Sequence, residues 1–161
     1  MDRTRTVTWH DPLPIAEKAR TMRGLDFLQA MIDGEIPRPP FAYLLGMTLI
    51  DVAPGRAVFT VTPAEFLYNP IGLVHGGVAM TILDSATGCA VQTMLEAGVG
   101  YTTVSGNTNF IRPITLDTGL LRAEAQTINV GRRIATAEAR LVDAAGKLYA
   151  HGVSTCAILT P

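Results

Sequence analysis

A pair of glycines and a single carboxylate lie in one apolar segment and are the first residues to suggest chemistry. Gly76 and Gly77 follow His75, and Asp84 comes eight residues after Gly76. If a helix begins here, its first backbone N–H groups lack intrahelical partners and lie at the positive end of the helix dipole. Such N–H groups stabilise a developing oxyanion by several kcal/mol in a dry site. The glycines therefore indicate an oxyanion hole, although close helix packing would also require them.

Asp84 is the second candidate. A carboxylate on a buried helix is costly without a partner, because desolvation opposes its charge. Its presence favours a general base for water, or a nucleophile that forms a mixed anhydride. The alternatives are a carboxylate hydrogen-bonded to a hydroxyl such as Ser85 or Thr81, or one that is exposed at an interface.

The spacing of these groups bears on assembly. Eight residues of helix separate Gly76 from Asp84 by about 12 Å, at about 1.5 Å per residue. Reacting groups must approach within about 3–3.5 Å, so one helix does not easily present both groups to one reacting carbonyl. Two antiparallel helices related by a two-fold axis bring the start of one near the aspartate of the other. We therefore predict two equivalent inter-subunit sites in a homodimer.

The periodicity of the chain predicts the elements that hold these residues. An amphipathic helix is expected over 14–32, a helical turn over 41–46, a β-hairpin from 47–52 and 56–62, and a long apolar helix over 75–97. Strands follow at 101–111, 119–130, 132–142 and 147–159. Alanines such as Ala123, Ala125, Ala137 and Ala139 alternate with polar residues, and small side chains let a helix approach a sheet closely. The order predicts an α+β fold in which an antiparallel sheet wraps a long central helix. We expect a domain over 41–161, preceded by an N-terminal helical extension over 1–40.

Composition narrows the class of protein. The 161 residues favour one domain, and 48% hydrophobic content with a net charge of −1 excludes a disordered chain or a nucleic-acid binder. Only 17% of residues are charged, against about 25% in typical domains, and no Lys or Arg occurs between Arg56 and Arg112. This shortage favours a surface covered by another copy.

The remaining compositional features concern metal, compartment and membrane. Cys89 and Cys156 form no CxxC pattern, so we expect reduced thiols and no metal site. The N-terminal sequence shows no signal-peptide pattern, and we expect a cytoplasmic protein. The apolar run 71–95 contains Asp84 and several glycines, which argue against a membrane span.

The segment from Asn69 to Ala86 resembles the hot-dog-fold acyl-CoA thioesterases, specifically the phenylacetate-pathway (PaaI-like) branch of the 4-hydroxybenzoyl-CoA thioesterase superfamily. The matching pattern is Asn69, then His75-Gly76-Gly77 opening the helix, then Asp84 followed two residues later by Ala86. The resemblance covers about 41–160. It implies hydrolysis of an acyl- or aryl-CoA to the free acid and CoA, with CoA as part of the substrate and no cofactor. It also implies a homodimer that can assemble into a tetramer as a dimer of dimers.

The resemblance also implies roles for individual residues. Gly76 supplies the oxyanion N–H, His75 and Asn69 shape that side of the site, and Asp84 comes from the partner subunit. A strand hydroxyl positions the water; by spacing this is Thr102, with Thr103 and Ser105 nearby. The candidates for contact with the acyl group or with CoA are Gly77, Ser85, Phe66, Tyr68 and Arg112.

The sequence is also compatible with two other functions. A non-catalytic hot-dog protein that binds acyl-CoA or another small ligand would keep the Gly76 pocket and make Asp84 dispensable. A hot-dog hydratase or dehydratase would need a histidine paired with Asp or Glu for proton transfer, and its characteristic motif is not present around His75.

Overall fold

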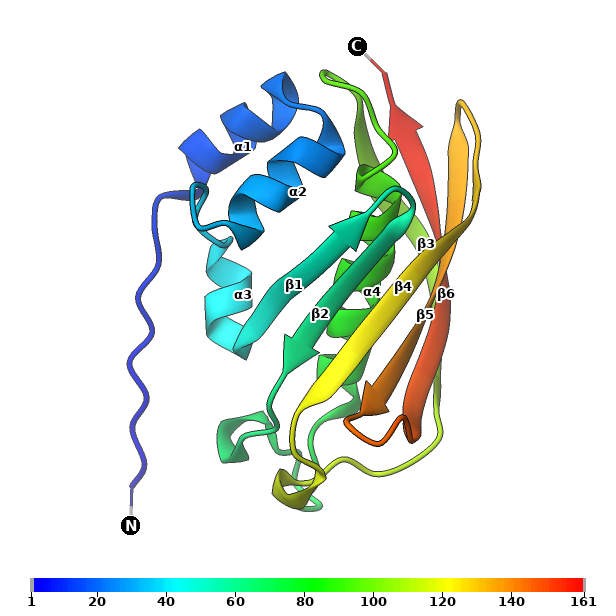
Figure 1. Cartoon of the computed structure of the whole chain (residues 1–161). Helices are drawn as coiled ribbons and strands as arrows, with labels where there is room; N and C mark the ends of the chain where they lie inside the picture. The colour runs from blue at the N-terminus through cyan, green and yellow to red at the C-terminus, as the bar shows by residue number, and fades with distance from the viewer. Residues whose placement is uncertain (1, 161) are drawn as a thin grey trace.

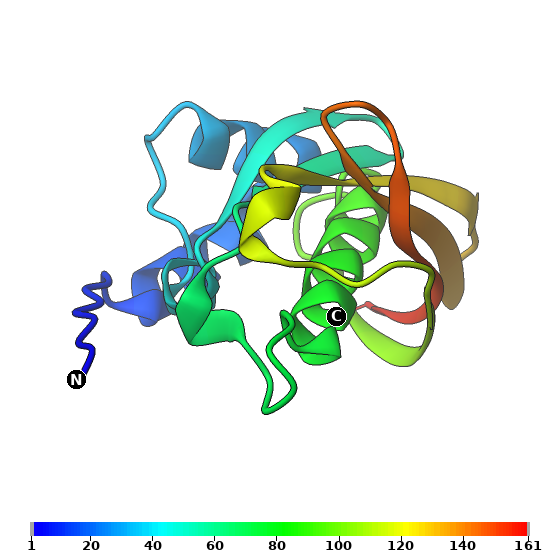
Figure 2. The ribbon, with the colours of Figure 1, turned by 90° about the horizontal axis from the view of Figure 1, so that it is seen from below.

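The computed structural model describes residues 2–160, and its main feature is one sheet of six strands. The strands are β1 (Met47–Ala53), β2 (Arg56–Val61), β3 (Gly100–Phe110), β4 (Leu121–Val130), β5 (Ile134–Asp143) and β6 (Leu148–Leu159). All neighbours are antiparallel, in the order β1-β2-β4-β5-β6-β3. The sheet curves around the long helix α4 (Gly76–Gln92) (Figures 1 and 2). The predicted antiparallel sheet around a central helix is confirmed, with strand ends within about two residues of those expected.

Small side chains line the face of the sheet that packs on α4. Ala123, Ala125 and Ala139 are at most 2% exposed, and they belong to one hydrophobic cluster with Ile82 and Ala86 of α4, which have no exposed surface. Because alanine occupies little volume, the helix axis lies close to the sheet. The alternation of alanine with polar residues therefore correctly predicted which face of β4 and β5 is buried.

The end of α4 differs from the prediction. The helix ends at Gln92, although the apolar pattern predicted that it would continue to residue 97. The Thr93 hydroxyl donates to Ala90 O (2.6 Å) and accepts a hydrogen bond from Gly55 N (2.8 Å) in the β1–β2 turn. These contacts tie the last turn of α4 to the hairpin, and the chain then leaves the helical path.

The N-terminal helix is also different, because it is two helices. They are α1 (Pro12–Thr21), capped by Asp11, and α2 (Gly24–Ile32). Gly24 N donates to Leu95 O (2.9 Å), and a Cβ on Gly24 would lie 1.7 Å from Gln92 O. The chain therefore turns at Met22 and Arg23, so that α2 starts in contact with the end of α4.

The helices α1, α2 and the short α3 (Pro40–Leu45) lie beside β1 (Figure 1). Ile15, Phe27 and Leu28 belong to the same hydrophobic cluster as the sheet and α4. Two 3₁₀ turns, Glu65–Leu67 and Leu116–Thr118, lie in the loops near the start of α4. The division of the chain at residue 40 stays a prediction.

Candidate active site

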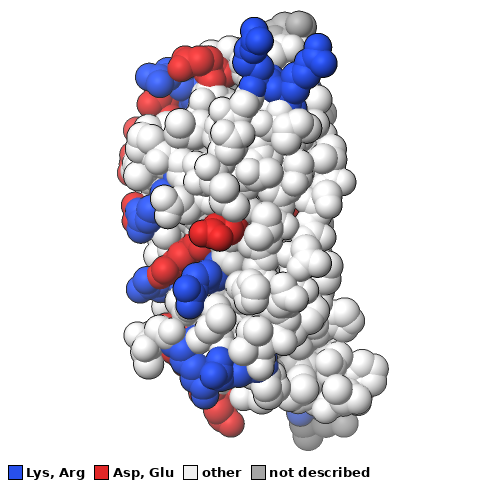
Figure 3. All heavy atoms as spheres, turned by 90° about the vertical axis from the view of Figure 1, so that its right-hand side faces the viewer, with Lys and Arg blue, Asp and Glu red and all other residues white. Residues whose placement is uncertain are grey.

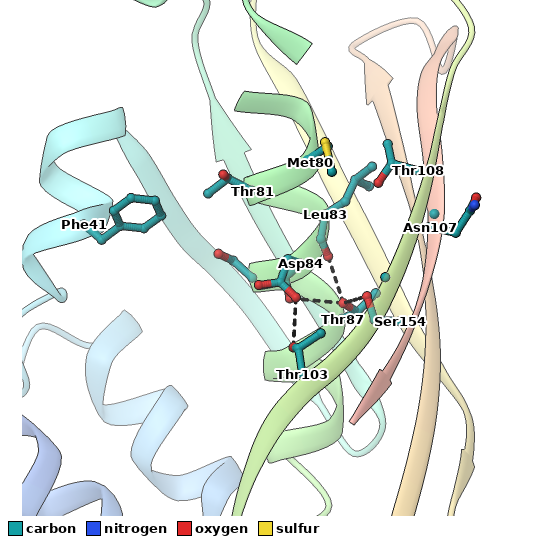
Figure 4. A pocket seen from close by; sticks show the side chains of 13 residues that line it. Phe41, Met80, Thr81, Leu83, Asp84, Thr87, Thr103, Asn107, Thr108 and Ser154 are labelled. Atoms are coloured by element: carbon teal, nitrogen blue, oxygen red, sulfur yellow. Dashed lines mark hydrogen bonds between the residues drawn. The ribbon is translucent and has the colours of Figure 1, made fainter. Parts of the chain in front are cut away.

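Asp84 lines an open surface pocket of about 530 Å³, which we call the Asp84 pocket (Figure 4). Its walls come from α4, from β3, from β6 and from Phe41 of α3. The Thr103 hydroxyl donates a hydrogen bond of 2.9 Å to Asp84 Oδ1. Asp84 is exposed in the single chain, on the side of α4 that the sheet leaves uncovered. The expectation of a buried carboxylate is thus wrong for the single chain, because the apolar pattern around Asp84 does not distinguish a sheet-covered helix face from an open one.

A buried group of hydrogen bonds supports the helical turn that carries Asp84. The Thr87 hydroxyl lies 3.0 Å from both Leu83 O and Asp84 O and 2.9 Å from Ser154 Oγ on β6. Thr87 is 1% exposed and Ser154 is 6% exposed. Since a threonine hydroxyl both donates and accepts, it can bond a helix carbonyl and the serine together. This contact fixes the turn of α4 at Asp84 against the sheet.

The start of α4 lines a second pocket of about 400 Å³, the Gly76 pocket, which also includes Asn69 and His75. His75 is the N-cap, and its Nδ1 accepts a hydrogen bond of 2.9 Å from Gly77 N. Asn69 Oδ1 accepts from Ile71 N and Leu73 N, both at 3.1 Å, which holds the preceding loop. Because the Gly77 N–H already donates to the His75 side chain, the Gly76 N–H is the group left to bind a ligand at this helix start.

Phe110 and Arg112 complete the Gly76 pocket. A Cβ on Gly76 would lie 3.2 Å from the Phe110 ring, so glycine here allows close packing as well as access to the backbone. The Arg112 guanidinium donates to Leu148 O. Arg112 also lines an adjoining pocket, together with Lys147 and Asp117.

The Asp84 pocket and the Gly76 pocket have no lining residue in common. The edge strand β3 passes along both, with Thr103 and Thr108 at the first pocket and Phe110 at the second. One chain therefore presents the two candidate groups to separate spaces, as their distance along the helix predicted.

The other candidates fall into different surroundings. Ser85 lines the Asp84 pocket. Thr102 is exposed and pairs with Ala157 of β6. Its side chain faces the opposite side of the sheet from that of Thr103, so it does not contact Asp84. The Tyr68 hydroxyl accepts a hydrogen bond from Leu116 N (2.9 Å), and the Arg5 guanidinium stacks 3.7 Å from the centre of the Phe66 ring. Neither aromatic residue lines the two pockets.

Within residues 2–160, no group of three or more His, Cys, Asp or Glu side chains is arranged to hold a metal ion. Among the helices in the same part of the chain, none has the length and apolar character needed to cross a membrane.

An antiparallel sheet wrapped around one long helix, with a His-Gly-Gly helix start and an aspartate farther along that helix, defines a hot-dog thioesterase. A family model described as the thioesterase superfamily matches residues 71–150, which include both Gly76 and Asp84. The chain belongs to the thioesterase superfamily and is a thioester hydrolase.

The relatives agree with this assignment. Human acyl-coenzyme A thioesterase 13 is 30% identical over 117 residues, covering 71% of this chain and 82% of that protein. The phenylacetic acid degradation-related protein of Ralstonia eutropha has a TM-score of 0.73 at 32% identity, covering 81% of this chain and 98% of that one. The PaaI protein of E. coli shares the fold, with a TM-score of 0.72 at 22% identity over 82% of this chain and 93% of that one. The resemblance to PaaI-like thioesterases is thus confirmed.

Proposed function

We propose that this protein is an acyl-CoA thioesterase that hydrolyses an acyl- or aryl-CoA to the free acid and CoA at sites formed between two subunits. The inter-subunit site is supported by the observation that Gly76 and Asp84 face separate pockets within one chain. A thioester carbonyl must meet both an oxyanion donor and an attacking group within about 3–3.5 Å. A partner subunit can supply the group that each pocket lacks.

In this proposal the Gly76 N–H stabilises the oxyanion that forms on the thioester carbonyl. Thr103 holds Asp84 Oδ1, which leaves Oδ2 free to act. Asp84 either removes a proton from the attacking water or itself forms a mixed anhydride that water then hydrolyses. In both routes the C–S bond breaks, CoA leaves as a thiolate, and the proton taken from water ends on the thiol or in solution. A thiolate is a good leaving group, so no strong acid is required.

The dimer would form through β3. This strand is an edge of the sheet, and an edge strand has unpaired backbone N–H and C=O groups. Neither β3 nor β6 contains Lys, Arg, Asp or Glu, and the side of the molecule that includes these strands has a wide uncharged area (Figure 3). Antiparallel pairing of two β3 strands would place the Phe110 end of one beside the Thr103 end of the other. The partner's Gly76 would then lie near Asp84.

Dimers associate into a tetramer. Arg112 and Lys147 contact the CoA phosphates, because both side chains line the pocket next to the Gly76 pocket. CoA enters only as part of the substrate, with no separate cofactor. The free thiols of Cys89 and Cys156 fit a reducing compartment, and we place the enzyme in the cytoplasm.

The deciding experiment compares wild type with Asp84→Asn in a CoA-release assay over aliphatic and aryl acyl-CoAs. A lost general base typically costs about 10²–10⁴-fold in rate, so we expect kcat to fall by at least about 100-fold with an unchanged Tm. Activity of Asp84→Asn within a few-fold of wild type would refute the role of Asp84. If wild type released no CoA but gained thermal stability from acyl-CoA, the protein would be a binding module instead.

A further inference from the structure

An inner cavity of about 290 Å³ lies behind Asp84, on the side away from the sheet centre. The N-terminal helices form much of its wall: Phe27, Leu28 and Met31 come from α2, and Ala42 comes from α3. Met47 of β1 and Phe59 of β2 close the side next to the sheet. The helices α1 to α3 precede residue 71, where the match to the thioesterase superfamily begins.

The inner cavity adjoins the Asp84 pocket. Phe41, Asp84, Ser85 and Thr103 line both spaces. The carboxylate therefore stands at the boundary between an open outer pocket and a more enclosed inner one. A thioester carbonyl placed at Asp84 has the inner cavity within reach of the group on its acyl side.

The polar groups on the cavity wall are engaged or neutral. The Arg38 guanidinium donates to Met47 O (3.2 Å) and Thr48 Oγ1 (2.9 Å) and stacks 4.4 Å from the centre of the Tyr43 ring. Burial, reinforced by the Asp84 carboxylate, raises the pKa of the Cys89 thiol to about 12. Burial likewise raises the pKa of Tyr101 above its ordinary value. Beyond Asp84 the cavity thus offers mainly apolar contact, which suits a hydrocarbon group.

The size of the cavity limits what it can hold. The free volume of about 290 Å³ is at the lower end of the about 300–1,000 Å³ that small-molecule sites have, so it suits a compact acyl or aryl group. The far wall includes Phe27 and Leu28, which are 5% and 2% exposed. A longer chain would have to displace packed core residues, and cores resist added volume.

We propose that the inner cavity receives the acyl group of the thioester, and that Met31 and Ala42 limit the length of that group. The inference rests on the proposed thioesterase function and adds its substrate class, which is compact apolar acyl or aryl groups rather than long-chain ones. Met31 and Ala42 are specificity-determining residues, since they line the cavity without contacting the reacting atoms.

Two substitutions should move the length limit in opposite directions. Met31→Ala removes three heavy atoms from the wall and should extend the limit by about three carbons, whereas Ala42→Leu adds three and should shorten it. Met22→Ala is the matched control, because Met22 is a partly buried methionine of the same extension that does not line the cavity. The measurement is kcat/KM for saturated acyl-CoAs of four, eight, twelve and sixteen carbons.

We expect Met31→Ala to raise kcat/KM for the twelve-carbon substrate by about tenfold or more, and Ala42→Leu to lower it for the eight-carbon substrate by a similar factor. The four-carbon substrate should change by less than a few-fold in every variant, and Met22→Ala should keep the wild-type profile. The proposal is overturned if both cavity variants keep the wild-type profile, or if wild type already prefers the sixteen-carbon substrate.

The cavity can also be tested apart from catalysis. If wild type releases no CoA, the proposed function fails, and the change in Tm with free butyric, octanoic and palmitic acids then tests the cavity alone. Octanoic acid should stabilise wild type and Met31→Ala but not Ala42→Leu. Equal stabilisation of all three proteins would overturn the assignment.

Discussion

Thr103 donates a hydrogen bond of 2.9 Å to Asp84 and so joins the edge strand of the sheet to the helix that carries the carboxylate. Its neighbour Thr102 faces the other side of β3 and is exposed. Two threonines that are adjacent in the sequence thus have different surroundings, and only one of them can orient the carboxylate directly.

Replacing Thr103 by valine should therefore lower kcat. A hydrogen bond to a charged group contributes about 1.5–3 kcal/mol, which corresponds to a loss of about 10–100-fold. Thr102→Val is the matched control and should stay within a few-fold of wild type, because it removes the same hydroxyl type from the opposite face. A larger loss in Thr102→Val than in Thr103→Val would contradict this role for Thr103.

Mixed dimers should show whether the site is shared. Gly76→Pro removes the proposed oxyanion N–H, and proline is accepted at the first position of a helix. His75 has φ −59° and ψ 134°, which suits the residue before a proline. We expect Gly76→Pro and Asp84→Asn to be inactive alone. When refolded together in equal amounts, half of the dimers are mixed and each has one intact site, so about a quarter of wild-type activity should return.

A second variant at Gly76 controls for the size of the substituted residue. Gly76→Ala keeps the N–H while making the same close contact with Phe110, so it separates loss of the donor from crowding of the ring. If each site lay within one chain, the refolded mixture would show no more activity than its separate components.

Stability should fall at alkaline pH because of Cys89. Its pKa is raised from 9.0 to about 12, first by burial and then by the Asp84 carboxylate. Above pH 9 the unfolded chain loses this proton while the folded protein keeps it, so the free energy of unfolding decreases by up to about 1.4 kcal/mol per pH unit until about pH 12. Cys89→Ala should show a shallower decline than wild type in urea titrations between pH 9 and 10. Parallel curves for the two proteins would exclude this contribution.

Gly24→Ala should destabilise the protein. An added Cβ would lie 1.7 Å from Gln92 O, so α2 would have to move from the end of α4. Overpacking of this kind costs about 1–3 kcal/mol, and the contact is with rigid backbone. The control is Gly100→Ala, whose Cβ would meet Leu159 at an ordinary 3.7 Å. Thermal unfolding should show a clear fall in Tm for the first variant only.

The sequence predicted the features that depend on local pattern. Gly76 at the start of a helix and the alanine-lined faces of β4 and β5 follow from periodicities of a few residues, and both are present. The separation of Gly76 from Asp84 followed from helix geometry alone. The family resemblance then supplied the class of reaction.

Features that depend on distant contacts were not predictable in the same way. The break between α1 and α2 follows from Gly24 meeting Leu95 O, and the early end of α4 follows from Thr93 meeting Gly55. The inner cavity is assembled from five or more elements, so no short pattern marks it. The inward position of Thr103 could have been inferred from strand alternation, because Tyr101 and Thr103 share one face of β3.

The alanine-lined face of the sheet also determines where this molecule has free volume. The void between α4, Val61 of β2, Leu121 of β4 and Leu141 of β5 is only about 10 Å³, about the volume of a single sphere the size of a water molecule. Space for a ligand is instead found on the open flank of α4, toward β3 and toward α2 and α3. The tightly packed side keeps the helix fixed while the loosely packed side can change, so substitutions that reshape the binding space should be tolerated on the flank and harmful in the core.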